Sequence, residues 1–182
     1  MNRSNAALAL FTLAACTAAH AETSNCTNLA ALPAVISTQG VYCLKQDLST
    51  SISSGAAISV NASNVTLDCN GYKLGGLGAG IGTAASGIVS QNRLNLTVRN
   101  CNIRGFRYGM RLAGTGGGHL VEDNRFDGNT FTGMYVSGDG SMIRGNSVFS
   151  TGGSTYTGEL ISWTTGIEAV AAAMSSTTPS GA

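Results

Sequence analysis

The residues best suited to chemistry are arginines and tyrosines that lie close together in the second half of the chain. They are Arg104, Arg107, Arg111, Arg125, Tyr108 and Tyr135. A guanidinium group pairs bidentately with carboxylates, and an aromatic ring offers a flat apolar face on which a sugar ring can stack. The set therefore predicts a surface that binds an acidic polysaccharide. The alternative interpretation is ordinary solvent-facing charge on adjacent strands.

Acidic residues and one histidine suggest two further kinds of site. Glu122, Asp123 and Asp127 are carboxylates of the type that binds calcium. Glu122 and Asp123 are adjacent, however, and adjacent residues of a strand point to opposite faces. His119 has the right chemistry for a general base, but the sequence assigns it no acidic partner. We therefore expect no cofactor, with calcium as an alternative, and catalytic residues stay unassigned.

The elements that must position these side chains follow from a repeat of 22–23 residues. Three segments alternate apolar and polar residues and then reach Asn or Cys, namely 96–103, 119–126 and 141–148. Their central residues Val98, Val121 and Ile143 lie 23 and 22 positions apart. This period is too short for a pair of helices and is typical of one coil of a parallel β-solenoid.

Further residues recur with the same period and complete the coil. The pairs Gly87-Ile88, Gly109-Met110, Gly133-Met134 and Gly166-Ile167 each begin a short strand. Segment 64–73 aligns without a gap on 95–104, and Gly75 to Ser86 is then an inserted loop. One coil therefore consists of three short strands. The stacked apolar columns that we expect are Leu67/Val98/Val121/Ile143, Tyr72/Ile103/Phe126/Val148 and Ile88/Met110/Met134/Ile167.

Two polar columns are expected beside the apolar ones. Asn70, Cys101, Asn124 and Asn146 share one aligned turn position. Charges of alternating sign share another, at Asp68, Arg99, Glu122 and Arg144. Opposite charges on neighbouring strands each contribute about 0.2–1 kcal/mol, so this second column is expected to help fix the register between coils.

The N-terminal 21 residues resemble an export signal. Arg3 precedes an apolar run from Ala6 to Ala15, too short to span a bilayer, and Ala19-His20-Ala21 matches an A-x-A cleavage site. A second interpretation stays open, because Leu13-Ala14-Ala15-Cys16 resembles a bacterial lipoprotein box with Cys16 as the lipidated residue. The first predicts a secreted or periplasmic protein, and the second an outer-membrane lipoprotein. We expect no membrane span in the rest of the chain.

The charge balance argues against one class of partner. The chain has ten Lys and Arg against nine Asp and Glu, and loss of residues 1–21 would remove Arg3 and leave the charges balanced. A general nucleic-acid binder needs an excess of positive charge. We therefore expect no nucleic-acid partner.

Four cysteines follow the export signal, at positions 26, 43, 69 and 101. In an exported chain they predict two disulfides, for which three connectivities exist. We favour Cys26–Cys43, which would close an N-terminal loop, and Cys69–Cys101, which would join neighbouring coils. Because no Cys-x-x-Cys spacing occurs, a zinc site is a weak alternative.

The expected organisation has four parts along the chain. Residues 1–21 form the signal, 22–48 an N-terminal cap, 49–170 the solenoid of about four to five coils, and 171–182 a frayed tail. The fold is thus all-β, with almost no helix. A cap protects a terminal coil from edge-to-edge pairing, and we find no evident cap at the C-terminal end.

The segments 64–71, 95–109 and 120–153 resemble the right-handed parallel β-helix repeat family, which includes carbohydrate-binding and sugar-hydrolysis domains and the pectate-lyase-like fold. The resemblance implies a single-stranded right-handed β-helix. It further implies that the Gly-Ile/Met strands form the sheet that carries the substrate groove. Val89, Arg111, Tyr135 and Glu168 would point outward from that sheet, and Arg107 and Tyr108 would form the wall before it.

Known catalytic signatures of the family are missing from the sequence. It has no paired-Asp and Gly-His-Gly constellation as in polygalacturonases, no Arg-x-Pro-x-x-Arg run as in pectate lyases, and no Asp-Pro-His as in alginate epimerases. Three hypotheses follow: a polysaccharide binder, a divergent lyase, hydrolase or epimerase, and a structural or adhesive module of the cell envelope. The candidate substrate-binding residues are Arg107, Tyr108, Arg111, Asp127, Tyr135 and Glu168.

Overall fold

The computed structural model describes residues 23–158 and 165–170. The expected export signal at 1–21, the alternative lipidation site at Cys16 and the expected tail at 171–182 lie outside the described residues. Within the described part, seventeen short strands and one three-residue 3₁₀ helix, η1 (Leu77–Ala79), follow one another along the chain. No described helix is long and apolar enough to cross a membrane.

The strands form three parallel sheets, which we number in the order in which one coil visits them. The first sheet contains, in spatial order, β1 (Thr27–Asn28), β3 (Gly40–Cys43), β6 (Val65–Asp68), β9 (Leu96–Arg99), β12 (Leu120–Glu122) and β15 (Met142–Arg144). The second sheet contains β4 (Leu48–Ser49), β7 (Lys73–Gly75), β10 (Asn102–Arg104), β13 (Arg125–Asp127) and β16 (Ser147–Phe149). The third sheet contains β2 (Ala34–Ile36), β5 (Ala56–Val60), β8 (Ser86–Gln91), β11 (Tyr108–Ala113), β14 (Thr132–Ser137) and β17 (Thr165–Val170).

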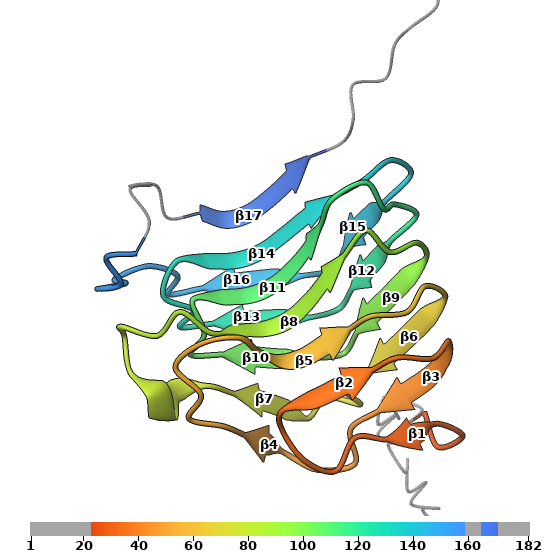
Figure 1. Cartoon of the computed structure of the whole chain (residues 1–182), viewed down its shortest axis with the longest axis horizontal. Coiled ribbons are helices and arrows are strands. Elements are labelled where there is room, and N and C mark those ends of the chain that lie inside the picture. The colour runs from red at the N-terminus through yellow and green to blue at the C-terminus, as the bar shows by residue number, and fades with distance from the viewer. Residues whose placement is uncertain (1–22, 159–164, 171–182) are drawn as a thin grey trace, which may run out of the picture.

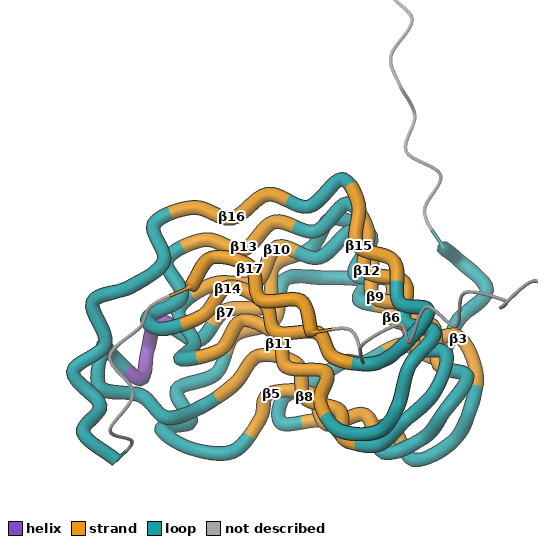
Figure 2. Tube along the Cα trace, turned by 90° about the horizontal axis from the view of Figure 1, so that it is seen from above, coloured by secondary structure: helices purple, strands orange, loops and turns teal. Residues whose placement is uncertain are grey.

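Consecutive strands of the chain always belong to different sheets, which is the topology of a parallel β-helix (Figure 1). From β3 onward each coil contributes one strand to each sheet, and Figure 2 shows strands of the first sheet (β15, β12, β9, β6 and β3) stacked on one side of the coils. The all-β solenoid fold that the repeat predicted is thereby confirmed. Residues 22–48, expected to form a cap, contribute β1, β2, β3 and the first residue of β4, so the stack of coils begins before residue 49.

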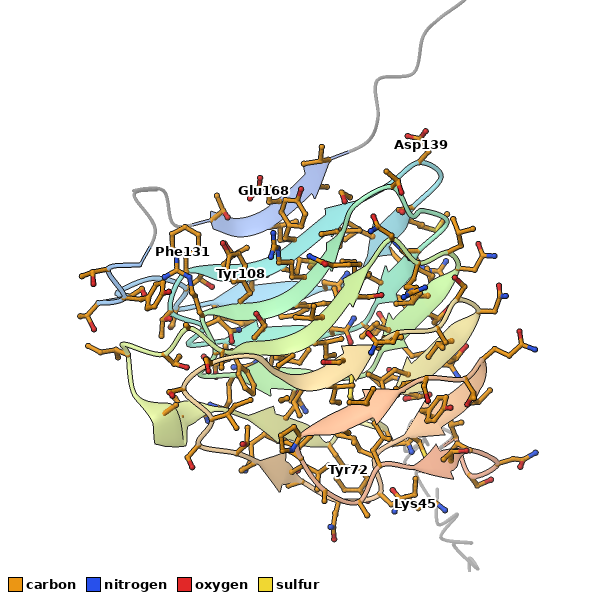
Figure 3. All side chains as sticks on the ribbon, viewed as in Figure 1. Lys45, Tyr72, Tyr108, Phe131, Asp139 and Glu168 are labelled. Carbon is orange, nitrogen blue, oxygen red and sulfur yellow. A yellow bond between two sulfur atoms is a disulfide. The ribbon has the colours of Figure 1, made fainter. Side chains whose placement is uncertain are left out.

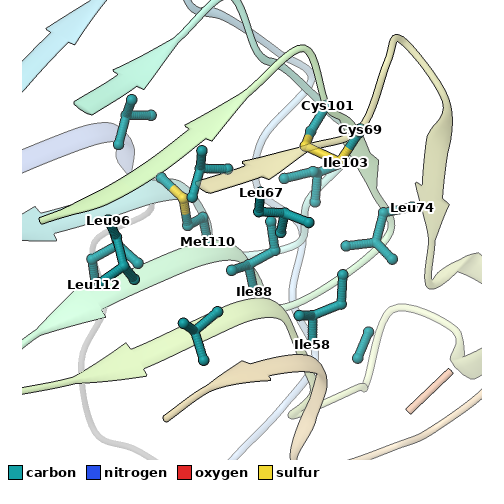
Figure 4. Close-up of a cluster of buried hydrophobic side chains, with 14 of the residues drawn as sticks. Ile58, Leu67, Cys69, Leu74, Ile88, Leu96, Cys101, Ile103, Met110 and Leu112 are labelled. Carbon is teal, nitrogen blue, oxygen red and sulfur yellow. A yellow bond between two sulfur atoms is a disulfide. The ribbon is translucent and has the colours of Figure 1, made fainter. Parts of the chain in front are cut away.

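The inward columns form the core, and two of the three have the predicted members. Leu67, Val98, Val121 and Ile143 are direct neighbours in the first sheet. Ile88, Met110, Met134 and Ile167 are direct neighbours in the third sheet. Figure 4 shows Leu67, Ile88 and Met110 packed together within the coils. Because a single coil exposes its apolar edges, this burial exists only in the stack.

The prediction for the third column was wrong at one residue. Leu74, and not Tyr72, lies beside Ile103 in the second sheet, in line with Phe126 and Val148. The turn after Asp68 contains two more residues than the equivalent turn after Arg99, since the register offset falls from 31 to 29 positions across it. Asn70 and Gly71 accommodate the longer turn with φ values of 50° and 79°.

Two disulfides join the pairs that the sequence analysis favoured. Cys26 is bonded to Cys43, with their Cα atoms 5.8 Å apart, and Cys69 is bonded to Cys101, with their Cα atoms 4.7 Å apart. The second bond links two neighbouring coils and lies in the core (Figure 4). Structural disulfides persist in oxidising compartments, so the pair indicates an environment outside the cytoplasm.

Amide side chains stack at the turn between the first and second sheets. The backbone N–H of Cys101 donates to Asn124 Oδ1 at 3.0 Å, and the backbone N–H of Asn124 donates to Asn146 Oδ1 at 3.0 Å. The Asn124 Nδ2 in turn donates to the Val98 carbonyl at 2.9 Å. Each amide thus satisfies backbone groups of the preceding coil, which holds the turns in register.

Candidate functional site

The outer face of the third sheet carries one column of outward side chains in consecutive coils. Ser59 lies beside Val89, Val89 beside Arg111, Arg111 beside Tyr135, and Tyr135 beside Glu168. The side chains of Arg111 and Glu168 are exposed, and Tyr135 is half-buried. Neighbouring parallel strands lie about 4.8 Å apart, so these three groups follow one another closely along the helix axis.

Glycines at the start of the third-sheet strands allow the coils to approach this closely. A Cβ atom at Gly109 would overlap the carbonyl oxygen of Gly133 and would lie 2.7 Å from the ring of Phe126. The glycine therefore lets β11 pass directly under β14 at the corner. The recurring Gly-Ile/Met pattern thus has a packing cause, and it sets where the outward column begins.

Arg107 does not face the solvent, in contrast to the wall position that the resemblance implied. Its side chain is only 3% exposed, and its Cζ lies 4.5 Å from the ring centroids of both Phe131 and Tyr156. The ring of Tyr108 lies 5.7 Å from the same Cζ and meets Phe131 edge-on at 5.4 Å. Arg107 is therefore the centre of an aromatic cluster, a structural cation–π arrangement.

The aromatic cluster touches the outward column through Tyr108. The Arg111 Cζ lies 5.7 Å from the Tyr108 ring centroid, and Tyr108 is half-buried. Figure 3 shows Tyr108 and Phe131 side by side at one end of the third sheet, with Glu168 on β17. Tyr156 carries no signal in the sequence pattern, because it lies in an irregular segment after β16 that has no counterpart in the other coils.

Asp127 is separated from the other candidate residues. It lies on β13, and its outward neighbour in the second sheet is Arg104. Its carboxylate lies 3.6 Å from the Arg125 guanidinium. Asp127 thus lies on a different sheet from Arg111 and Tyr135, because residues 120–127 span two strands that belong to two different sheets.

The acidic residues considered for calcium are dispersed. Glu122 accepts hydrogen bonds from Arg144 at 2.6 and 2.9 Å on the first sheet, whereas Asp123 lies in the following turn and Asp127 on the second sheet. Within residues 23–158 and 165–170, no three His, Cys, Asp or Glu side chains form a group that could hold a metal ion.

His119 is buried beside the first sheet, on another side of the coil from the third. Its Nδ1 accepts a hydrogen bond from the backbone N–H of Leu96 at 3.3 Å. Burial lowers the pKa of His119 below its usual value, because the charged imidazolium is poorly solvated there. The side chain therefore acts as a neutral acceptor that links two coils.

Comparison with known proteins agrees with this geometry. Residues 86–173 match the family described as right handed beta helix region. The chain contains a right-handed β-helix region. The matched part of this β-helix begins at the first residue of β8 and includes β11, β14 and β17, which carry Arg111, Tyr135 and Glu168. Neither the curated proteins nor the solved structures include a significant match.

The outward column on the third sheet of this β-helix combines charged and aromatic groups. Arg111 offers a planar hydrogen-bond donor, Tyr135 a ring and a hydroxyl, and Glu168 an acceptor. The backbone beneath them is held by ladder hydrogen bonds on both sides of β11 and β14. A rigid platform of this kind loses little conformational entropy when a ligand binds.

Proposed function

We propose that this β-helix binds a polysaccharide along the outer face of its third sheet without cleaving it. The observation that carries the proposal is the column of Arg111, Tyr135 and Glu168 on three successive coils. A sugar chain that lies along the helix axis would meet a donor, an aromatic face and an acceptor in turn. Tyr108 extends this surface at the side of Arg111.

The tyrosines and the charged groups would bind different parts of a sugar. An aromatic face binds the apolar side of a sugar ring, and the guanidinium of Arg111 pairs with a carboxylate or with hydroxyl groups. Arg107 contributes indirectly, because its position between Phe131 and Tyr156 supports the adjoining Tyr108. We therefore assign the ligand contacts to Tyr108, Arg111, Tyr135 and Glu168.

The proposed compartment is the periplasm or the medium of a bacterial cell. The two disulfides support an oxidising environment, and the export signal expected at residues 1–21 would deliver the chain there. A lipid anchor at Cys16 would instead tether the same domain to the outer membrane. Both arrangements would place the domain outside the cytoplasm.

The divergent-enzyme alternative gains no specific support from the geometry. It requires carboxylates that converge on Arg111 and Tyr135, and their column supplies one, Glu168, which lies beside Tyr135 but two coils from Arg111. Asp127, the carboxylate that the alternative named, lies on the second sheet. Incubation with pectate and alginate, monitored for unsaturated products and reducing ends, is expected to give no turnover.

Glycan-array screening followed by calorimetric titration tests the proposal. We expect an Arg111→Ala/Tyr135→Ala variant to bind the best glycan at least about tenfold more weakly, a loss of about 1.4 kcal/mol. Met142→Ala is the matched control, because Met142 is 55% exposed but lies on the first sheet. Equal binding by all three proteins, or no glycan bound by the wild type, would overturn the proposal and favour an adhesive role.

A further inference from the structure

The outer face of the second sheet is hollowed, and the proposed function makes no use of it. Two adjoining hollows of about 450 and 420 Å³ share Lys73 and Arg104 in their walls. Ser49, Thr50 and Ser51 line the first hollow beyond these two residues. Asp47, Asn102, Arg125 and Asp127 line the second. Together the hollows form a groove that crosses β4, β7, β10 and β13.

The groove exists because of a glycine and an inserted loop. Gly75 occupies an outward position of the second sheet, between Ser49 and Arg104. A Cβ atom there would lie 2.9 Å from Ser49 Oγ and 3.6 Å from Lys73 Cε, so a larger side chain would fill the floor. The loop after Gly75 contains η1, and Leu77 and Gly78 supply one wall.

Two of the three cations in the groove form ion pairs with carboxylates, and Arg104 is the third. Lys73 pairs with Asp47 at 3.2 Å, and Arg125 pairs with Asp127 at 3.6 Å. Arg104 lines both hollows, and its Nε is buried without a hydrogen-bond partner among the described residues. A buried donor without a partner costs free energy, and an anion bound to Arg104 would remove that cost.

The cations also repeat with the coils. Lys73 lies on β7, Arg104 on β10 and Arg125 on β13, so three successive coils each present one cation to the groove. The coils are about 4.8 Å apart, which is comparable to the length of one sugar unit. The three cations are staggered, since Lys73 and Arg125 both lie beside Asn102 and Arg104 lies two residues further along its strand. A carboxylated oligosaccharide that crosses the coils obliquely would meet all three.

The neighbouring groups favour a singly charged, hydroxylated ligand. The three cations are partly offset by Asp47 and Asp127, and these carboxylates would repel a group that carries two negative charges. The hydroxyl groups of Ser49, Thr50 and Ser51 can exchange hydrogen bonds with sugar hydroxyls. A guanidinium fork pairs bidentately with a carboxylate.

We infer that the groove on the second sheet is a second glycan site, which binds a carboxylated oligosaccharide through Arg104. The site is separate from the third-sheet surface, since its residues belong to β4, β7, β10, β13 and the loop after β7. Gly75 keeps the floor open, Arg104 binds a sugar carboxylate, and Lys73 and Arg125 attract the neighbouring units.

Titration of the full chain with oligogalacturonate tests this inference, with neutral galactan as the matched ligand. We expect Arg104→Gln to weaken oligogalacturonate binding at least about tenfold, while Arg144→Gln, an exposed arginine of the first sheet, has no effect. Arg104→Lys is expected to lose part of the affinity, because it keeps the charge but not the fork. Oligogalacturonate binding should also weaken as salt is raised.

Three results would overturn the inference: no oligogalacturonate binding by the wild type, equal binding by Arg104→Gln and Arg144→Gln, or displacement of the sugar by equimolar inorganic phosphate. The same titration on Arg111→Ala separates the two sites. Loss of binding in Arg111→Ala alone supports the third-sheet proposal and contradicts the groove. Loss of oligogalacturonate binding in Arg104→Gln alone supports the groove and indicates that this ligand does not bind to the third sheet.

Discussion

Asp68 on β6 and Arg99 on β9 lie opposite each other on adjacent coils, with Arg99 Nε 2.8 Å from Asp68 Oδ2. The Asp68 side chain is buried and accepts further hydrogen bonds from the Thr23 hydroxyl, the Asn70 backbone N–H and the Asn100 side chain at 2.6, 2.9 and 3.1 Å. Burial alone would raise the pKa of Asp68, but these donors together hold it below its usual value.

Replacement of Asp68 by Asn should therefore lower the free energy of unfolding by about 2–4 kcal/mol, because several donors lose a charged acceptor in a buried place. Urea unfolding at pH 7 measures the loss. Arg144→Ala is the matched control, since Arg144 is exposed and its pair with Glu122 is expected to contribute less than about 1 kcal/mol. Equal losses in the two variants would contradict the buried-network interpretation.

The buried His119 predicts a dependence of stability on pH. Its folded pKa is lowered, so as pH falls through the ordinary histidine value of about 6.5 the unfolded chain takes up a proton that the folded chain does not. Stability should therefore decline from pH 7 toward pH 5. His119→Asn keeps an acceptor for the Leu96 N–H and should flatten this slope in thermal unfolding. An unchanged slope in the variant would contradict the assignment.

Gly109→Ala tests the packing origin of the Gly-Ile/Met pattern. The added methyl group would meet Phe126 and the Gly133 carbonyl, so we expect a loss of more than about 2 kcal/mol in unfolding free energy. Gly128→Ala is the control, since Gly128 has a φ of +60° with open space at its Cβ, and it should cost only about 1–2 kcal/mol. A milder effect at Gly109 than at Gly128 would contradict the close approach of the coils.

Arg107 and Arg111 should differ in what their removal changes. Arg107→Ala empties a buried position between Phe131 and Tyr156, and we expect it to lower the unfolding free energy by about 2–4 kcal/mol. Arg111→Ala removes an exposed side chain and should leave stability within about 0.5 kcal/mol. Thermal denaturation of both variants measures this contrast. An unchanged unfolding free energy in Arg107→Ala would contradict the structural role of Arg107 and favour a role in ligand binding.

The repeat was sufficient to predict one inward column of the first sheet and one of the third, because the residues of these two columns are apolar in every coil that it covers. Val98, Val121 and Ile143 occupy the predicted column, as do Met110 and Met134. The alignment failed at Tyr72, where a turn lengthened by two residues shifts the register. A gapless comparison of sequences does not detect such a change when apolar residues stand at both positions.

The candidate site was only partly accessible from the sequence. The outward positions of Arg111, Tyr135 and Glu168 follow from strand alternation. The burial of Arg107 depends on Tyr156, which belongs to an irregular segment and arrives from another coil. The hollow around Arg104 depends on how the inserted loop lies against the second sheet. Contacts made by segments outside the repeat cannot be predicted from the period of the repeat.

Hydroxyl-radical footprinting with a bound glycan tests the central claim most directly, because it reports which side chains the ligand covers. The glycan with the highest affinity on the array should protect Tyr108 and Tyr135 on the third sheet while the oxidation of Met142 on the first sheet stays unchanged. Protection of Met142 with unaltered labelling of Tyr108 and Tyr135 would contradict the account.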